Sequence, residues 1–520
     1  MRLFDVLGPV MIGPSSSHTA GAARIGYTAQ KLLGEIPAQA DIGLYGSFAT
    51  TGKGHGTDKA LVAGLLGLRP DDPRLPDSFA LAAEQGMAFR IHPVELRSAH
   101  PNTAVLTLTG REGRVLSMKA ASVGGGRIRV TEIDGVPADF GGDSNTLIIH
   151  NEDNPRLHRR GDHLPCRAQD QRCIDAGVPR RNRRLCRYGT GVRFPHPPPA
   201  GTEAGDPARH PEGDLPEHRR ARRRRGGMTM SFLSCEEMLA AARSQNLSLA
   251  EAILRSDLAE SRLTEEASRH AMHHLWHVME ATSREYDPAQ RSRSGLSGGD
   301  AAKVEQAHQA GRSYGGDYLA EVTAEALKTA ECNACMKRIV AAPTAGSCGV
   351  LPAVLLPLAR AGEADEEAIC DALYVAAGFG QVIAARATLA GAEGGCQAEV
   401  GAASAMAAAA LCHLKGGTPE QCTAAAAMAL GNLLGLVCDP VAGLVEVPCI
   451  KRNVVGAVNA VSCANMALAG VDYAIPCDEV IDAMGRVGSL LSPDLRETGQ
   501  GGLAATPTGV RIAERLAEEA

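Results

Sequence analysis

A block from Arg156 to Gly227 constrains the fold more than any other part of the sequence. It holds 18 arginines and no lysine against eight acidic residues, a net charge of +10, and it includes the runs RRNRRLCRY, FPHPPP and HRRARRRRGG. Its residues follow neither the period of a strand nor that of a helix. Because such a segment buries too little apolar surface to offset its chain entropy, we expect disorder. The 520-residue chain must therefore fold as separate regions on either side of it.

Two explanations of this block stay open. Abundant Arg, Pro, Gly and His without Lys is what a G+C-rich gene yields when it is read out of frame, so a pair of compensating frameshifts, real or a sequencing artefact, is one hypothesis. A functional basic linker is the other. Basic blocks usually indicate nucleic acid, but we favour the frameshift and expect no nucleic-acid partner. Resequencing the gene, together with peptides that match the block, would separate the two explanations.

The rest of the chain has the composition of an ordinary soluble protein. It carries a net charge of −16, and over the whole sequence hydrophobic residues make up 44% and charged residues 22%. Even the Ala-rich stretch near Met406 is bounded by Glu399 and Lys415, so no segment is expected to span a membrane. The N-terminus shows no signal-peptide cleavage pattern. We expect a cytoplasmic protein whose 15 cysteines are not disulfides, and in which any bound metal uses a minority of them.

Residues 1–154 are predicted to form an α/β domain, because short alternating segments there are separated by Gly-rich loops. The predicted strands are Ile42–Tyr45, Ala104–Thr109, Arg127–Ile133 and Thr146–His150, and the predicted helix is Lys59–Leu68. The segment SVGGG is expected to separate two of the strands.

Residues 231–520 are predicted to form an all-α domain. The predicted helices are Cys235–Ser244, Leu249–Ala259, Leu263–Ala281, Ala368–Leu389, Ala402–Leu414, Pro419–Leu434 and Val454–Ala469. Alanine-dense helices with glycine at their ends favour close backbone approach, and we expect the loops between them to hold the chemistry. The fold class is therefore multidomain, with an α/β domain, the aberrant segment at 155–230 and an all-α domain.

Three cysteines of the all-α domain stand in unusual settings. Cys396 lies in GAEGGCQAEVG, Cys438 in LGLVCDPVAG and Cys449 in VEVPCIKRN, each beside Gly, Pro or Asp at an expected helix boundary. Backbone N–H groups at such boundaries stabilise thiolates and hydrogen-bond to cluster sulfurs. The absence of a compact C-x-x-C pair among them argues against structural zinc. Three ligands would leave one iron of a four-iron cluster open as a Lewis acid, while ordinary buried thiols are the alternative.

Three further cysteines carry a weaker signal. Cys332 and Cys335 form a C-x-x-C pair, but the pair lies in an expected helix and has no second pair, so buried or surface thiols are the favoured interpretation. Cys348 lies in a Gly/Thr loop, in APTAGSCGVLP, and is not assigned as a ligand.

Polar residues of the α/β domain indicate a site for an anion. The segment GPSSSHTAGAARIG places Ser15, Ser17 and His18 just before an expected helix, where hydroxyls and N–H groups can bind a carboxylate. Simple N-capping by one serine is the alternative.

His55 lies between two glycines in KGHGTDKA, so we expect an accessible ring that can act as a general base; a hydrogen-bonded structural histidine is the alternative. His100 and Asn102 precede a strand in RSAHPNTAV. Ser122 precedes three glycines whose N–H groups could line a pocket. Each of these signals is weak alone, and their concentration in one domain is what gives them weight.

These motifs resemble the bacterial iron–sulfur L-serine dehydratases, also called L-serine ammonia-lyases. In the α/β domain the resemblance is carried by GPVMIGPSSSHTAGAARIG, YGSFATTGKGHGTD, HPNT and SVGGG. In the all-α domain it is carried by SGLSGGDAAK, PTAGSCGVLP, GGCQAEVGAASAMAAAA, GLVCDPVAGLVEVPCIKRN and RETGQGGLAATPTG. It covers roughly residues 3–154 and 231–518, and this chain resembles a fusion of regions that some members keep on separate subunits.

The resemblance implies conversion of L-serine to pyruvate and ammonia. It further implies that Cys396, Cys438 and Cys449 ligate a [4Fe-4S] cluster and that His55 is the base. The residues implied to surround the substrate are Ser15, Ser17, His18, Thr57, His100, Asn102 and Ser122. The site would then form between the two domains. Some members end in a cysteine that reaches back to the cluster, but this chain ends AEEA, so no such self-inhibition is expected.

The chain also departs from the family. HNEDNP, at His150–Pro155, resembles the opening of the ACT-type regulatory domain of similar members, but the residues after Pro155 bear no resemblance to that domain. The departure supports the frameshift hypothesis and puts regulatory or cation-dependent activation in doubt.

Other functions stay open. A pyridoxal-phosphate dehydratase would need a Schiff-base lysine, for which Lys303 in GLSGGDAAK is a weak candidate. A related cluster dehydratase could act on threonine or another hydroxy acid. The alternative that is not an enzyme is a serine-binding regulatory protein or an inactive pseudogene product. The sequence is compatible with a homo-oligomer and does not fix the oligomeric state.

Overall fold

The computed structural model describes residues 2–50, 52–142 and 231–519, together with 146, 150–151 and 184–185. Residues 1–142 and 231–520 form one compact unit, and residues 143–230 form another. In the second unit, β8 (His150–Asn151) pairs antiparallel with β9 (Arg184–Leu185). Apart from 184–185, the predicted segment at 155–230 lies outside the described residues. Its disorder and its frameshift origin therefore remain predictions.

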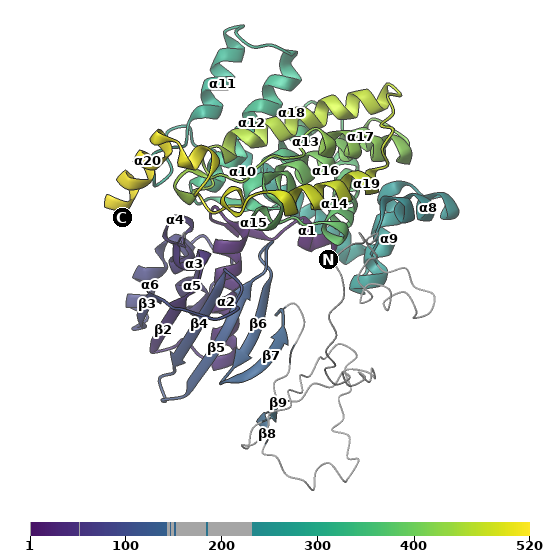
Figure 1. The fold of residues 1–520 in the computed structure, drawn as a ribbon. Coiled ribbons are helices and arrows are strands. Elements are labelled where there is room, and N and C mark those ends of the chain that lie inside the picture. The colour runs from purple at the N-terminus through teal and green to yellow at the C-terminus, as the bar shows by residue number, and fades with distance from the viewer. Residues whose placement is uncertain are drawn as a thin grey trace, which may run out of the picture. The chain divides into compact units, whose positions relative to one another are not determined.

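The N-terminal region, residues 2–142, is built on a six-stranded sheet with the strand order β3-β2-β4-β5-β6-β7 (Figure 1). The first pair in that order, β3 and β2, is parallel, and all other neighbours are antiparallel. The strands are β2 (Gln39–Leu44), β3 (Ala88–Pro93), β4 (Thr103–Thr109), β5 (Val115–Ser122), β6 (Ile128–Ile133) and β7 (Val136–Phe140). The α/β prediction is confirmed, and three of its strands correspond to β2, β4 and β6. The fourth, predicted at 146–150, is described only at its two ends.

Two helices of this region pack unusually closely. They are α2 (Ala22–Leu33) and α5 (Thr57–Leu65), and α2 also contacts β4 and β5. A Cβ atom on Gly64 would lie 2.1 Å from the Ala23 carbonyl oxygen, and one on Gly26 would lie 2.3 Å from the Leu61 carbonyl oxygen. Real Cβ atoms do not approach other atoms so closely, so the two glycines permit this contact. The helix predicted at 59–68 corresponds to α5.

The helical region, residues 231–519, consists of helices connected by loops and short 3₁₀ turns. Its helices are α8 (Cys235–Gln245), α9 (Leu249–Ser261), α10 (Glu265–Arg284), α11 (Asp300–Gln309), α12 (Gly316–Ala334), α13 (Val350–Arg360), α14 (Glu366–Arg386), α15 (Gly391–Gly394), α16 (Val400–Leu414), α17 (Pro419–Gly431), α18 (Cys449–Leu468), α19 (Cys477–Leu490) and α20 (Pro507–Glu518). All seven predicted helices are present. The prediction at 454–469 began five residues late, since α18 starts at Cys449.

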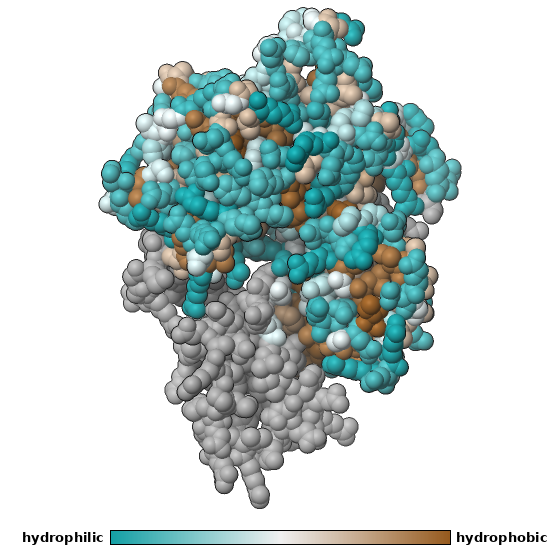
Figure 2. Space-filling model, turned by 180° about the vertical axis from the view of Figure 1, so that it is seen from behind, coloured by the Kyte–Doolittle hydropathy of each residue, from teal (hydrophilic) through white to brown (hydrophobic). Residues whose placement is uncertain are grey.

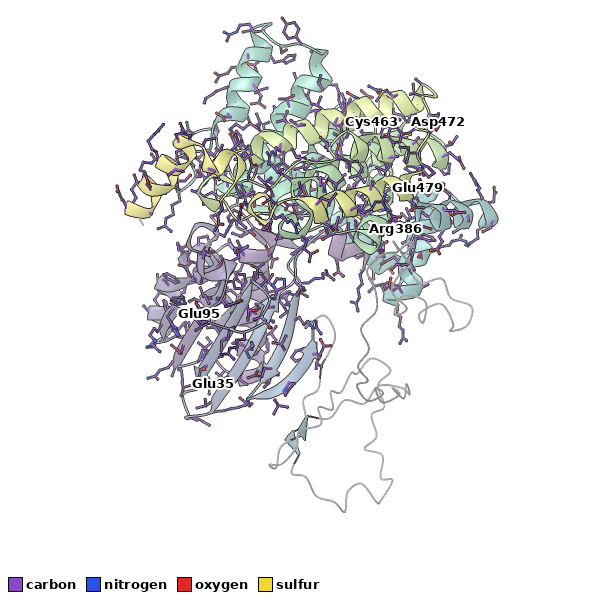
Figure 3. All side chains as sticks on the ribbon, in the orientation of Figure 1. Glu35, Glu95, Arg386, Cys463, Asp472 and Glu479 are labelled. Atoms are coloured by element: carbon purple, nitrogen blue, oxygen red, sulfur yellow. The ribbon has the colours of Figure 1, made fainter. Side chains whose placement is uncertain are left out.

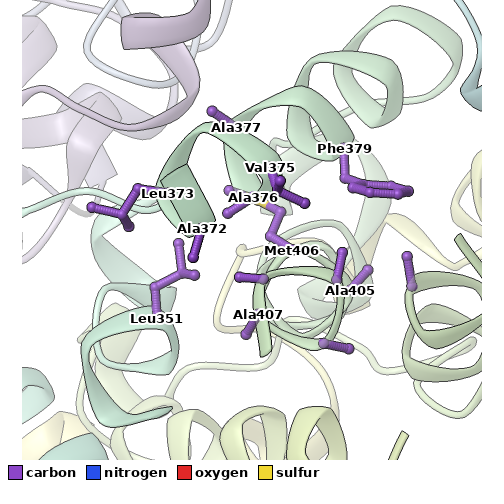
Figure 4. Packing of buried hydrophobic residues seen from close by; sticks show 14 of the residues in the cluster. Leu351, Ala372, Leu373, Val375, Ala376, Ala377, Phe379, Ala405, Met406 and Ala407 are labelled. Atoms are coloured by element: carbon purple, nitrogen blue, oxygen red, sulfur yellow. The ribbon is translucent and has the colours of Figure 1, made fainter. Parts of the chain in front are cut away.

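The core of the helical region forms around α14 and α16. Figure 4 shows Ala405, Met406 and Ala407 of α16 packed near Ala376 and Phe379 of α14. Small side chains let these helices approach closely and bury both on nearly all sides. By length and composition α14 could cross a membrane, but four-fifths of its apolar stretch is buried here, as in the core helix of a folded domain.

The N-terminal chain begins inside the helical region. Helix α1 (Leu3–Val6) packs against α14, where a Cβ on Gly380 would lie 2.3 Å from Val6 Cγ1. Strand β1 (Val10–Ile12) then pairs antiparallel with β10 (Arg338–Val340). The region predicted as all-α therefore contributes one strand, β10. Its partner β1 lies about 330 residues away in the sequence, so the three residues of β10 alone could not identify it as a strand.

Surface hydrophobic side chains are few and scattered along the chain, as at Val115, Tyr314 and Leu490. Figure 2, which views the molecule from behind, shows a largely hydrophilic surface with separate hydrophobic patches. Single exposed apolar residues of this kind are normal. The alanine-rich helices thus direct most of their apolar side chains inward.

Candidate functional site

The ends of several strands bring the predicted polar residues to one end of the sheet. Leu44, the last residue of β2, pairs with Ala104 near the start of β4. The start of β4 also lies opposite the end of β5, where Thr103 pairs with Ala121. The segment 45–56, which contains the short helices α3 (Ser47–Thr50) and α4 (Gly52–His55), therefore leaves the sheet at the same end as loops 98–102 and 123–127. They carry His55, His100, Asn102 and the glycines after Ser122.

A cavity of about 60 Å³ joins this end of the sheet to the loops of the helical region. The N-terminal region contributes Ser15, Ser17, His100, Asn102, Gly124 and Gly125, among others, to its wall. The helical region contributes Cys396, Cys438, Cys449, Thr344, Glu399 and Glu497, among others. Seven of the eleven residues predicted for the site therefore line one cavity, and the other four, His18, His55, Thr57 and Ser122, do not.

The three cysteines of this cavity are buried, with 3% of Cys396, 4% of Cys438 and 7% of Cys449 exposed. Burial raises the pKa of Cys396 to about 12, and it raises the pKa values of Cys438 and Cys449 well above their usual range. Negative charge on Cys396 further raises the pKa of each of the other two. The three thiols are thus close electrostatic neighbours that need a bound cation to ionise together.

The backbone holds the three cysteines in two ways. Cys396 begins the 3₁₀ turn η6 (Cys396–Ala398), and Cys449 begins α18, so both lie at helical N-termini as predicted. Cys438 instead lies in an extended segment. Its N–H donates to the Leu495 carbonyl at 2.8 Å, and its carbonyl accepts from the Glu497 N–H at 2.8 Å. The predicted helix boundary was wrong for Cys438, because a parallel bridge to Arg496 fixes it.

The cavity wall offers several side chains that could bind metal, namely the thiols of Cys396, Cys438 and Cys449, the carboxyl groups of Glu393, Glu399 and Glu497, and the His100 ring. Across residues 2–50, 52–142 and 231–519, no three His, Cys, Asp or Glu side chains converge on one point as a mononuclear metal requires. A four-iron cluster attaches each thiolate to a different iron, so its ligands surround a volume. Three buried thiols around one cavity, with no histidine ligand among them, match that requirement.

Ser15, Ser17 and His18 form a connected hydrogen-bond network. Ser15 Oγ accepts from the His18 N–H at 3.0 Å and caps the π-helical turn η1 (Ser16–Gly21), so the alternative interpretation of N-capping holds for this serine, and anion binding stays a prediction. His18 Nδ1 lies 3.2 Å from Ser17 Oγ, and its Nε2 lies 2.9 Å from Ser47 Oγ. Burial, and then the neighbouring His55, lower the pKa of His18 well below its usual value. His18 is therefore a neutral ring that orients two hydroxyls of the cavity wall.

His55 lies behind this network, with its ring centroid 4.6 Å from that of His18. Only 1% of it is exposed, so the expectation of an accessible ring was wrong. The flanking glycines serve packing instead: a Cβ on Gly54 would lie 2.8 Å from Leu444 Cδ2, in the loop between Cys438 and Cys449. The His55 carbonyl also accepts the Thr19 hydroxyl at 2.8 Å.

The remaining predicted residues divide between the cavity and its support. His100 lines the cavity and is exposed, and partial desolvation lowers its pKa; its Nδ1 accepts from the Asn102 N–H at 3.1 Å. Thr57 and Ser122 are fully buried outside the cavity wall, and their hydroxyls have no hydrogen-bond partner within the described part of the chain. A Cβ on Gly21 would lie only 2.1 Å from Ser122 Oγ, so Ser122 packs tightly against η1.

Two carboxyl groups of the cavity were missed by sequence reasoning. Glu399 Oε1 accepts the Thr344 hydroxyl at 2.8 Å, and its Oε2 lies 3.9 Å from Cys438 Sγ. Burial and the charge of Glu399 raise the pKa of Glu497 to about 8, and burial also raises that of Glu399. Both residues stand inside the motifs GGCQAEVG and RETGQGG, but only the folded chain brings these motifs together.

Other candidate residues lie away from the cavity. Cys332 and Cys348 pack in an apolar cluster with Met11 and Ile339, which agrees with the interpretation of Cys332 as a buried thiol and with leaving Cys348 unassigned as a ligand. Lys303 is 71% exposed and pairs with Asp300 at 2.7 Å, and it does not line the cavity. This position gives no support to a Schiff-base lysine.

The sequence was compared with known protein families and curated proteins. The family model for the serine dehydratase alpha chain matches residues 244–504, and that for the serine dehydratase beta chain matches residues 3–81. The probable L-serine dehydratase alpha chain of Bacillus subtilis is 45% identical over 285 residues, covering 55% of this chain and 95% of that protein. The L-serine dehydratase of Mycobacterium tuberculosis is 30% identical over 97% of each chain. L-serine dehydratase 1 of Escherichia coli is 31% identical over 97% of this chain and 98% of its own.

Proposed function

This chain belongs to the serine dehydratase family, with its beta-chain and alpha-chain regions in one polypeptide, and we propose that it converts L-serine to pyruvate and ammonia. In this proposal Cys396, Cys438 and Cys449 hold a [4Fe-4S] cluster. The observation that carries the proposal is the shared cavity, which three buried thiols of one region and the Ser, His and Asn side chains of the other line together. Neither set of residues would have a function without the other.

The reaction removes the Cα proton and the C3 hydroxyl of L-serine as water. The resulting 2-aminoacrylate tautomerises to an imine, and addition of water releases ammonia and leaves pyruvate. When bound, the cluster supplies an iron without a protein thiolate, a Lewis acid that makes hydroxide a better leaving group. The protein must therefore hold the substrate, neutralise its charges and accept one proton.

The cavity wall offers partners for both charged groups of the substrate. Hydroxyls of Ser15 and Ser17 and the Asn102 amide can donate to the carboxylate. Among the described residues that line the cavity there is no lysine or arginine, whereas Glu399 and Glu497 are present. We assign these two carboxyl groups to the substrate ammonium. A cation between them would favour their ionised forms and reverse the effect of burial on their pKa values.

Two histidines compete for the role of base. His55 carries the role by resemblance and lies in contact distance of His18, which holds Ser15 and Ser17. His100 lines the cavity directly, and its lowered pKa keeps it neutral and able to accept a proton at neutral pH. We retain His55, which lies behind the Ser15–Ser17–His18 network, as the proposed base. His100, which lines the cavity, is the specific alternative. Ser122 and Thr57 are proposed as supports of the substrate loops.

We place this activity in cytoplasmic amino-acid degradation, with L-serine as the main substrate. L-threonine differs by one methyl group beside the departing hydroxyl, and a hydrophobic pocket discriminates against one methyl group by only about 10- to 200-fold. Comparing the two amino acids in the same assay will define the specificity.

Anaerobic purification followed by iron analysis and a pyruvate assay tests the proposal. The wild-type protein should contain about four irons per chain, show visible absorption that bleaches in air, and form pyruvate from L-serine. Cys438→Ala should lose both the iron and the activity. The matched control is Cys463→Ala, a buried thiol labelled in Figure 3 that lies on α18 about 21 Å along the helix from Cys449. Pyruvate formation by iron-free protein or by Cys438→Ala would refute cluster catalysis.

A further inference from the structure

We propose that Arg452 is a positioning residue that ties the segments of Cys438 and Cys449 together and balances the negative charge of the cluster that the three cysteines would hold. This inference rests on the proposed function, because it concerns the cluster that Cys396, Cys438 and Cys449 would hold. It assigns a role to a residue that touches neither the substrate-binding hydroxyls nor the candidate bases.

The side chain of Arg452 spans two of the segments directly. It lies on the first turn of α18, three residues after Cys449. Its Nη1 donates to the Val437 carbonyl at 2.7 Å, and its Nη2 lies 2.9 Å from Asp439 Oδ1. Val437 and Asp439 are the two neighbours of Cys438. One guanidinium therefore fixes the residues on both sides of Cys438 to the helix that begins at Cys449.

The third segment is related to the same guanidinium by charge. The positive charge of Arg452 acts to lower the pKa of the Cys396 thiol, against the larger effect of burial. It acts in the same direction on Cys449. Cys396 and Cys449 are 53 residues apart in the sequence, so one guanidinium that fixes two of the segments also supplies positive charge to the third.

A buried carboxylate holds Arg452 in place. Only 3% of the Asp439 side chain and 14% of the Arg452 side chain are exposed. Asp439 Oδ2 accepts from the Leu503 N–H at 2.8 Å, and a Cβ on Gly502 would lie 2.3 Å from this oxygen. The C-terminal loop thus closes over the carboxylate, which cannot swing away. A planar guanidinium can satisfy several acceptors in fixed directions, which a lysine ammonium cannot do equally well.

The charge of Arg452 also has a predictable effect on the cluster. Reduction adds an electron, so a fixed positive charge nearby stabilises the reduced state and raises the reduction potential. Glu399 and Glu497 in the same cavity act in the opposite direction. Removing the guanidinium should therefore lower the potential, whereas a lysine at this position should preserve the charge and lose the bridging geometry.

Three variants of the full-length protein, reconstituted anaerobically with iron and sulfide, test these two roles. Arg452→Gln removes both the positive charge and the guanidinium group that contacts Val437 and Asp439. Arg452→Lys keeps the charge but not the guanidinium group. The matched control is Arg386→Gln, which removes a guanidinium of α14 that pairs with Asp482 of α19 at 2.6 Å and does not line the cavity; Figure 3 labels Arg386. The measurements are the reduction potential of the cluster, its rate of loss to a chelator, and the melting temperature of each protein.

Arg452→Gln should lower the potential and lose its cluster about 10- to 100-fold faster than the wild type, as expected for the loss of a residue that supports metal ligands. Arg452→Lys should keep the wild-type potential but lose its cluster faster, and Arg386→Gln should match the wild type in both. Wild-type potential and wild-type loss rate in Arg452→Gln would overturn the inference. If Arg452→Gln does not fold, Arg452→Lys decides alone, and a wild-type loss rate overturns it. A wild-type protein that binds no cluster would refute the proposed function instead.

Discussion

At the scale of single residues, the site places neutral histidines behind hydroxyl groups. Burial keeps His18 uncharged, and its two ring nitrogens lie within hydrogen-bond distance of hydroxyls, Ser17 on one side and Ser47 on the other. A charged imidazolium there would lose hydration through burial and would stand beside a second imidazole ring, that of His55. The network therefore orients the serines of the cavity wall without adding charge to it.

The candidate bases can be separated by substitution. If His55 accepts the proton, His55→Ala should lower kcat by about 10²- to 10⁴-fold, while iron content and visible absorption stay at wild-type levels. The exposed His270 on α10 provides a control, since His270→Ala should leave kcat unchanged. His100→Ala should mainly raise KM. The reverse pattern, with kcat lost in His100→Ala and retained in His55→Ala, would transfer the role to His100.

The lowered pKa of His18 predicts a pH dependence of stability. In the unfolded chain its pKa is about 6.5, so below that pH the unfolded state binds a proton that the folded state refuses. Stability is therefore present above about pH 6.5 and is lost as the pH falls, by up to about 1.4 kcal/mol per pH unit. The melting temperature of cluster-free protein should fall between about pH 7.5 and 5.5. His18→Gln should show a smaller fall, and an equal fall in both proteins would contradict this account.

Sequence reasoning selected three cysteines that line one cavity but did not predict the surroundings of each residue. Gly, Pro and Asp beside Cys396, Cys438 and Cys449 gave a local signal, and the structure brings all three to one cavity. Gly54, beside His55, packs against Leu444, almost 400 residues later, and no local pattern carries that information. Glu399 and Glu497 escaped notice for the same reason, since their neighbourhood exists only after folding.

At the scale of elements, close helix packing positions the loops of the site. Helices α2 and α5 each follow a segment that supplies predicted site residues, η1 before α2 and the His55 loop before α5. Their contact at Gly26 and Gly64 therefore sets the distance between His18 and His55.

Gly64→Ala should separate these helices and disturb the site. The added Cβ would lie 2.1 Å from the Ala23 carbonyl oxygen, and overpacking of this kind costs about 1–3 kcal/mol. The control is Gly401→Ala on α16, where a Cβ would meet Leu430 Cδ1 at an ordinary 3.4 Å and a gain of up to about 1 kcal/mol is expected from helix propensity. Urea unfolding measures both, and a Gly64→Ala protein as stable as the wild type would show that the helices can separate without cost.

Elements were predicted from the sequence where their pattern was long. Alanine-dense helices such as α14 and α16 were recognised within a few residues at either end. Strand β5 was missed because it reads VLSMKAAS and runs into the Gly-rich segment that was expected to be a loop. The three-residue strands β1 and β10 carry no periodicity at all, and only their pairing defines them.

At the scale of the whole molecule, the cavity requires both regions of the chain. Its serines follow β1 and its Thr344 follows β10, so the β1–β10 pair sets both walls in register. The Asn333 side-chain amide strengthens this joint by donating to the carbonyls of Pro14 at 3.2 Å and Ala345 at 3.0 Å.

Separating the two regions tests this dependence. Residues 1–154 and 231–520 expressed apart should each fail to form pyruvate, because each lacks one wall of the cavity. Co-expression should restore activity to the extent that β1 and β10 still pair. Pyruvate formation by residues 231–520 alone, in an anaerobic assay with full iron content, would show that the N-terminal region does not contribute to the site.

The position of α1 also has a consequence for folding during synthesis on the ribosome. Val6 is made 374 residues before its packing partner Gly380. At a synthesis rate of about 5–20 residues per second, the wait is roughly 20 to 75 s. During that time the apolar segment that holds Val6 has no native packing partner, and it is a natural binding site for a chaperone.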